Sequence, residues 1–220
     1  MYLYMLPLSS ASSSSDPVLS AAQDEALVPT PDGGAEITAA HFDDAAAWLA
    51  AEGRGAVTLF PPQYFLLHLL SRFLTGARTS SSSSSSSETA AESESESESH
   101  HYASQRDRLR AFLDTVPTST DPRAAVHPTS RIPWARKVIS PVVIGLRRGD
   151  RRSILALDGP GAELRGSGHG GDWERVVLVA FGKGGPSRCE VRDRQEVLAE
   201  ERAAKAADEN EGAEGSSSKL

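Results

Sequence analysis

A glycine-rich hexapeptide in the last third of the chain has the spacing of a phosphate-binding loop. Gly166–Gly171, with the sequence Gly-Ser-Gly-His-Gly-Gly, matches the pattern G-x-G-x-x-G. In dinucleotide-binding folds this loop follows a strand and opens a helix, whose N-terminus holds the pyrophosphate. Here the loop leads through Asp172 into the apolar run Val176–Val179, which is typical of a strand. The context is wrong for a dinucleotide, and the pattern predicts a flexible loop instead.

The other candidates for chemistry are isolated side chains, from which we assign no catalytic residue and no metal ligand. His100 and His101 form a pair that could bind a metal ion, but the sequence places no third ligand beside them. Cys189 is the only cysteine, which excludes an intrachain disulfide and a thiolate metal cluster. Its strand-like surroundings predict a small buried residue. His68 lies in an apolar stretch, where a hydrogen-bonded core residue is more common than a ligand.

Hydrophobic periodicity indicates the elements that would position these residues. Met1–Leu8 is apolar throughout and predicts a buried strand, which needs partners on both sides. Because no residue precedes it to supply one, we expect this strand to belong to a fold that is incomplete in the chain. The segments that follow predict a loop, two short strands and two helices: loop 9–34, strand 35–38, helix 41–51, strand 57–60 and helix 63–74.

A low-complexity segment, Arg78–Ser99, separates the two halves of the chain. Its serine run and Ser-Glu alternation bury too little apolar surface to offset the entropy of ordering, so we expect an unstructured insertion. The second half predicts a small antiparallel β unit between two helices: helix 105–116, strands 137–146, 153–157, 175–181 and 190–193, and helix 196–207. The expected parts of the chain are residues 1–76, the insertion 77–104, a helix plus β-rich part 105–207, and a flexible tail 208–220.

Charge and hydropathy restrict the class of function. The net charge of −7 argues against a general nucleic-acid binder, which needs a basic patch to neutralise phosphates. No apolar run approaches the roughly 20 residues of a membrane-spanning helix, and the N-terminus lacks the basic flank of a secretory signal. A local basic cluster could meet an anionic ligand, although a charged hairpin tip is the more common arrangement. Its members are Arg147, Arg148, Arg151 and Arg152.

The last three residues form a targeting signal. Ser218-Lys219-Leu220 is the tripeptide that the peroxisomal import receptor binds at a free carboxyl terminus. The residues before it, Asp208–Ser217, are small or acidic, which predicts an accessible end. We therefore expect a peroxisomal location, with the import receptor as a partner.

The last helix contains a carboxylate pattern, Gln195–Glu201, that resembles part of the Nudix box. The box, G-x5-E-x7-R-E-U-x-E-E-x-G-U, gathers carboxylates on one helical face to hold a divalent metal against a diphosphate. Here the spacing between Glu196 and the pair Glu200-Glu201 is one residue too long, and Gln195 stands at the arginine position. We reject it as a catalytic box and expect a charged, solvent-exposed helix.

Several other segments resemble the peroxisomal coenzyme A diphosphatase branch of the Nudix hydrolases. Residues 1–8 are similar to the aromatic-rich strand that follows the box in that branch. Glu36, then Ala47-Trp48-Leu49, then Leu59-Phe-Pro-Pro-Gln-Tyr64 follow in the order of the family. The similarity covers about the first third of the chain, and residues 132–198 resemble more weakly the C-terminal extension of fungal relatives.

The resemblance implies an α/β fold, with an incomplete Nudix-like α/β/α sandwich followed by a small β-rich extension. It also implies hydrolysis of the diphosphate linkage of coenzyme A or acyl-coenzyme A, with Mg²⁺ or Mn²⁺. In the family, the box and the coenzyme A recognition segment precede the strand that begins here at Met1, so no metal-binding glutamate has a matching position. Only Pro61, Pro62, Gln63 and Tyr64 correspond to family positions, as a structural or pocket-lining element.

Two functional hypotheses follow. The first is the C-terminal portion of a Nudix-type pyrophosphohydrolase, inactive as this chain, with a coenzyme A-type substrate only for a longer form. The alternative is a non-catalytic peroxisomal protein that acts as an interaction module or a regulator. A third possibility, an unrelated enzyme, has no spacing pattern to support its residues: Asp158, Glu163, His169 and Asp172.

Overall fold

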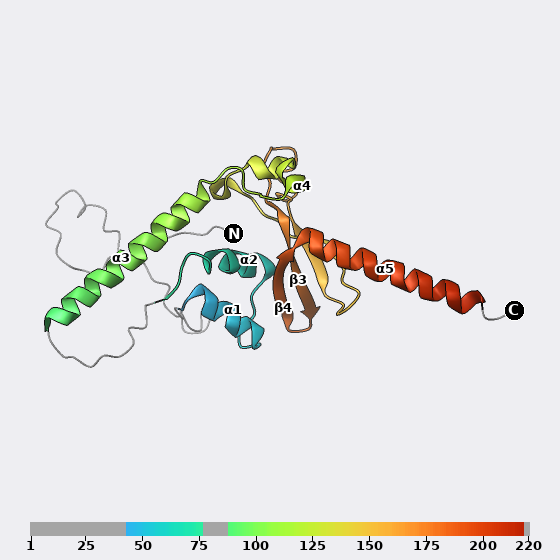
Figure 1. Ribbon diagram of the computed structural model, residues 1–220, viewed down its shortest axis with the longest axis horizontal. Coiled ribbons are helices and arrows are strands. Elements are labelled where there is room, and N and C mark those ends of the chain that lie inside the picture. The colour runs from blue at the N-terminus through green and yellow to red at the C-terminus, as the bar shows by residue number, and fades with distance from the viewer. Residues whose placement is uncertain (1–42, 77–87, 218–220) are drawn as a thin grey trace. The chain divides into compact units, whose positions relative to one another are not determined.

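A computed structural model describes residues 43–76 and 88–217 of the chain (Figure 1). The chain divides into two units, Met1–Phe42 and Asp43–Leu220, and every described residue belongs to the second. The strands expected at 1–8 and 35–38 and the tripeptide at 218–220 lie outside the described residues.

The second unit combines helices with a sheet, which is compatible with the α/β class that the sequence predicts. Its helices are α1 Ala45–Gly53, α2 Pro61–Leu70, α3 Glu88–Leu113, α4 Pro122–Ala125 and α5 Arg194–Ser217, with 3-10 turns at Pro128–Arg131 and Trp134–Arg136. Its strands are β1 Val142–Leu146, β2 Ser153–Leu157, β3 Asp172–Gly182 and β4 Gly185–Asp193. Within 43–76 and 88–217, no helix has both the length and the apolar character that crossing a bilayer requires.

The four strands form one antiparallel sheet in the order β1-β2-β3-β4. This confirms the antiparallel β unit, and β2 has the predicted bounds. β4 is longer than predicted because it continues to a tight turn between Gly182 and Gly185, whereas β3 gains three residues at its start, where Asp172 pairs with Leu157. β1 is shorter than predicted, since Val138 and Ser140 donate to loop carbonyls rather than to a strand.

Both faces of the inner strands are buried. The alternation along β2 and β3 places Leu155 and Val177 on the face that packs against α2. The main cluster on this face consists of Phe65, Leu69, Trp134, Leu155, Leu157, Val177, Val179 and Cys189. The opposite face forms a smaller cluster of Ile154, Val176 and Leu178 with Val197, a buried apolar side chain of α5. The sheet therefore provides the core to which α2 and α5 attach.

The first two helices form close to where the sequence predicts. α2 begins at the proline pair, which suits a first turn because its N–H groups have no partner within the helix. The backbone N–H of Phe60 donates to Gln63 Oε1 at 3.0 Å and caps this end. The strand predicted at 57–60 is wrong: these residues form no ladder with the described strands, and Leu59 instead offers its carbonyl to the Cys189 thiol at 3.8 Å.

α3 reaches further toward the N-terminus than the predicted helix 105–116. It begins at Glu88 and so includes residues expected to be unstructured. Glutamate and alanine both favour helix, which supports this extension. Gln105 fastens the helix to the end of the preceding segment, because its side-chain amide accepts from Thr75 N at 2.9 Å and donates to Thr75 O at 3.0 Å.

Candidate functional site

The Pro-Pro-Gln-Tyr element has a structural role at the start of α2. Pro61 is buried, and Tyr64 packs against the main cluster. Burial, reinforced by the negative charge of Glu52, raises the pKa of the Tyr64 phenol. Gln63 uses its side chain for the helix cap. These contacts show a structural role for the element at the start of α2. Its pocket-lining role remains a prediction.

Cys189 lies beneath this element as a buried thiol, as the sequence predicts. Its backbone N–H donates to Glu52 Oε1 at 3.0 Å, and the Glu52 side chain is itself buried at the end of α1. Burial, with the adjacent Glu52 carboxylate, raises the pKa of the thiol to about 12. A thiol that stays protonated at neutral pH is a poor nucleophile and a poor metal ligand, so this contact joins α1 to β4 rather than performing chemistry.

A polar cavity of about 280 Å³ opens between α2, β3 and β4. Two of its charged groups have partners beside the cavity: Arg175 Nη1 lies 2.9 Å from Asp172 Oδ2, and Glu174 accepts from Ser119 Oγ at 2.6 Å. Burial, with the neighbouring Arg175, lowers the pKa of His68, which therefore remains neutral near pH 7. The lining residues are His68, Thr120, Glu174, Arg175, Val191, Arg192 and Asp193. His68 thus lies in the polar wall of this cavity. The Pro-Pro-Gln-Tyr residues do not line the cavity.

The glycine-rich hexapeptide forms a loop that leads into β3, as expected from its context. Its final glycine is needed for packing, because a Cβ on Gly171 would overlap the carbonyl of Leu157. Gly166 and Gly168 adopt φ values of +80° and +78°, which side chains rarely tolerate. The spacing of these glycines therefore reflects turn geometry and close contact with β2, and no helix follows to hold a phosphate.

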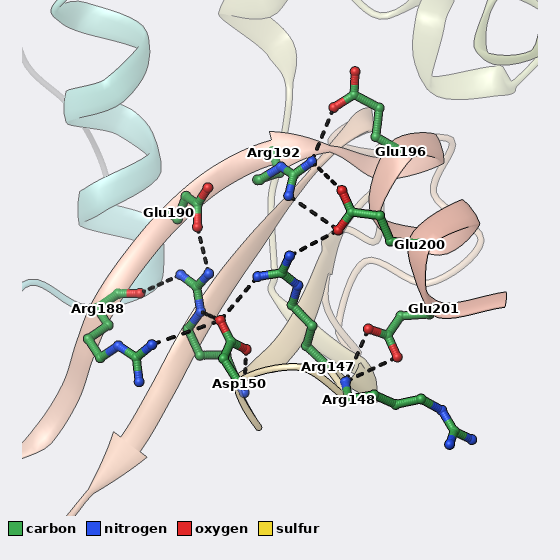
Figure 2. A network of polar contacts seen from close by, with 10 residues as sticks. Arg147, Arg148, Asp150, Arg188, Glu190, Arg192, Glu196, Glu200 and Glu201 are labelled. Carbon is green, nitrogen blue, oxygen red and sulfur yellow. Dashed lines mark hydrogen bonds and ion pairs between the residues drawn. The ribbon is translucent and has the colours of Figure 1, made fainter. Parts of the chain in front are cut away.

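The predicted basic cluster lies at the tip of the β1–β2 hairpin, where acidic side chains pair with Arg147, Arg148 and Arg152, whereas Arg151 is exposed and is not part of this network (Figure 2). Arg152 is 7% exposed and pairs with Asp150 at 2.7 Å and with Glu190 at 2.6 Å. The network contains five arginines and five carboxylates: Arg147, Arg148, Arg152, Arg188 and Arg192 with Asp150, Glu190, Glu196, Glu200 and Glu201. The charges balance, so this cluster is a structural tie between the hairpin, β4 and α5 rather than an anion site.

The carboxylates of α5 are part of this tie. Glu200 accepts from Arg147 at 3.0 Å and from Arg192 at 2.7 Å, while Glu201 accepts from the backbone N–H of Arg148 at 3.1 Å. Across the residues that the structure describes, no group of three His, Cys, Asp or Glu side chains is placed to hold a metal ion. The Mg²⁺ or Mn²⁺ that the family resemblance implies for a longer form remains a prediction.

Strand β1 presents an unusually apolar surface to solvent. Four of its five residues are large aliphatic side chains exposed to between 42% and 58%: Val142, Val143, Ile144 and Leu146. Among the described elements, only β2 makes extensive contact with β1, whereas the opposite edge strand, β4, contacts both α1 and α2 (Figure 1). We define these four residues as the β1 edge. Sequence reasoning missed them because a continuous apolar run predicts a buried strand.

Long apolar edges are normally covered, because their unpaired backbone groups and side chains attract other chains. The β1 edge is therefore the described surface most suited to a partner, whereas charged groups of the polar cavity and of the arginine network already have partners. Comparison of the chain with family models, with curated proteins and with solved structures finds no match.

Proposed function

We propose that this chain is a non-catalytic interaction module whose contact surface is the β1 edge. The observation that carries the proposal is the exposure of four aliphatic side chains on a strand that, among the described strands, pairs on one side only. Exposed apolar surface of this kind adds no stability to the isolated fold. It becomes favourable only when a partner removes it from water, at about 25 cal/mol per Å².

The rest of the described fold is consistent with a support for this surface. β2, directly behind β1, is buried over Ile154–Leu157, and the ionic tie of Figure 2 fastens the far end of the hairpin to α5. A rigid backing of this kind lets a partner bind without first ordering the strand, which lowers the cost of association.

Site-specific photo-crosslinking tests the proposal. The crosslinking amino acid p-benzoylphenylalanine replaces Ile144 in one variant and Val126, which is 76% exposed and lies outside the sheet, in a matched control. We expect discrete protein adducts in cells from position 144 and none of the same mass from position 126. Adducts that are identical at both positions, or absent at position 144, would contradict the proposal.

A second candidate function is supported by the order of segments that resembles the coenzyme A diphosphatase branch of the Nudix hydrolases. In this proposal the chain is part of a longer pyrophosphohydrolase, in which residues 1–76 belong to a Nudix-like sandwich and the antiparallel sheet belongs to its C-terminal extension. The start of α2 at Pro61-Pro62, packed through Tyr64, supports the assignment of that element as structural. The C-terminal Ser-Lys-Leu favours delivery of either form to peroxisomes.

An activity assay tests the expectation, shared by both candidates, that this chain alone is inactive, and the sequence upstream of Met1 separates them. We expect the chain alone, with coenzyme A and Mg²⁺ or Mn²⁺, to release no phosphoadenosine phosphate above a blank. Metal-dependent release well above the blank would overturn the view of this chain as non-catalytic. An in-frame Nudix box upstream of Met1 in the genomic DNA would support the longer enzyme.

A further inference from the structure

We infer that the β1 edge binds an extended, uncharged aliphatic segment of a partner protein, which adds to the sheet as a fifth strand. This inference rests on the proposed function and names the class of partner that the edge can accept. Three features of β1 carry it: the two faces on which its side chains are exposed, the direction of its free backbone groups, and the small area that it offers.

The side chains of β1 are exposed on both faces of the sheet. Val142 pairs with Ala156, on the face of the smaller cluster, and is 55% exposed. Val143 pairs with Leu155, on the face of the main cluster, and is 58% exposed. A docked helix or a flat protein surface covers one face of a sheet and leaves the other in water. An added strand covers both, because its own side chains alternate between the two faces.

The backbone of β1 presents hydrogen-bonding groups to the open side. Arg147 N donates to Arg152 O at 2.7 Å across the hairpin, so the N–H and C=O of the preceding Leu146 point away from β2. Before the start of the strand, Ser140 N donates to Gly159 O at 2.9 Å, on the side of β2. Because backbone groups alternate in direction along a strand, the N–H and C=O of Val143 point outward. These outward groups match the ladder of an incoming strand.

The area of the edge is too small for a stable contact with a second copy of the chain. A strand of five residues is about 17 Å long, and four half-exposed aliphatic side chains offer on the order of 200 Å². A stable dimer buries about 800 Å² on each partner. Affinity at this edge must therefore come from main-chain hydrogen bonds, which favours a short extended peptide over another globular surface.

The two arginines that follow β1 in the chain, Arg147 and Arg148, are already paired, so the segment needs no charge to compensate them. At the hairpin tip, Arg147 is paired with Asp150 and Glu200, and Arg148 is paired with Asp208. An acidic peptide would compete with carboxylates already in place. The segment that fits best is thus rich in valine, isoleucine or threonine, residues that favour strands.

Titration with synthetic peptides tests the inference on the full chain. The probe is acetyl-(Thr-Val)3-Thr-amide with methyl groups on its valine nitrogens, which leaves one hydrogen-bonding edge free and prevents self-assembly. The control carries methyl groups on every peptide nitrogen. We expect saturable binding of the probe, slower amide exchange at Val143 and Leu146, and at least tenfold weaker binding of the control. Equal binding of both peptides, no binding of the probe up to 1 mM, or slow exchange at Val143 and Leu146 before any peptide is added would overturn the inference.

Two variants make the outcome specific to β1. The double substitution Ile144→Lys with Leu146→Lys should weaken probe binding at least tenfold, whereas Val126→Lys, also at an exposed valine, should leave it unchanged. Unchanged binding by the double variant would contradict the inference. If crosslinks form at position 144 while the probe does not bind, the interaction function stands and strand addition fails. If neither is observed, both fail.

Discussion

Val197 is the buried apolar side chain through which α5 packs against the sheet, so Val197→Ala is an informative perturbation. Val197 is 0% exposed and lies in the cluster with Ile154, Val176 and Leu178. Truncation removes about two methyl groups from a site closed by β2 and β3. We expect a loss of about 2 kcal/mol in the free energy of unfolding, between the ranges for Ile→Val (about 0.5–1.5) and Leu→Ala (about 2–5).

Urea denaturation followed by circular dichroism measures this loss, and the slope of the transition should stay unchanged. Val126→Ala is the matched control, because its side chain is 76% exposed and its truncation should change stability by less than about 0.5 kcal/mol. If the free energy of unfolding of the Val197→Ala variant lies within about 0.5 kcal/mol of that of the parent chain, then α5 is not anchored by this contact and the packing argument is refuted.

Three further predictions concern charge, burial and targeting. Hydrogen bonds from Arg192 and then Arg147 lower the pKa of Glu200, so its contribution to stability is present above the unfolded glutamate pKa of about 4.3 and is lost as the pH falls through the lower folded value. Glu200→Gln should therefore reduce the change in urea midpoint between about pH 6 and pH 3, and an unaltered pH dependence would count against the ionic tie. Cys189 should resist iodoacetamide at pH 8 in the native chain and react in urea, because burial raises the pKa of its thiol to about 12; rapid native alkylation would show that the thiol is accessible. Removal of Leu220 should abolish punctate peroxisomal fluorescence of an N-terminally tagged chain, and unchanged puncta would argue against the targeting signal.

The elements with a strong local pattern were predictable from sequence. Ser153–Leu157 is a short apolar run bounded by turn residues, and its strand has the predicted bounds. The proline pair at Pro61 marks the start of α2, because proline suits a first helical turn. By contrast, residues 57–60 have strand-like composition but lack a ladder partner among the described strands, and no local pattern reveals whether a partner is present.

The features that define the candidate surface depend on distant contacts. Arg147 and Glu200 are far apart in sequence, so their pairing follows from the register of the hairpin and the direction of α5. An apolar run does not reveal whether its strand becomes an inner or an edge strand. Leu155 is buried because β2 is an inner strand, and Val143 is exposed because β1 is an edge strand. The arginine cluster was correctly assigned to a hairpin tip, but the pairing of three of its arginines with carboxylates required the fold.

Hydrogen exchange of the backbone amides of β1 in the free chain tests the central claim most directly. If β1 is an open edge, the amides of Val143 and Leu146 should exchange about 100-fold or more faster than that of Val177 on the inner strand β3. Protection of Val143 and Leu146 equal to that of Val177 would mean that the edge is already covered, and the account of β1 as a binding surface would be wrong.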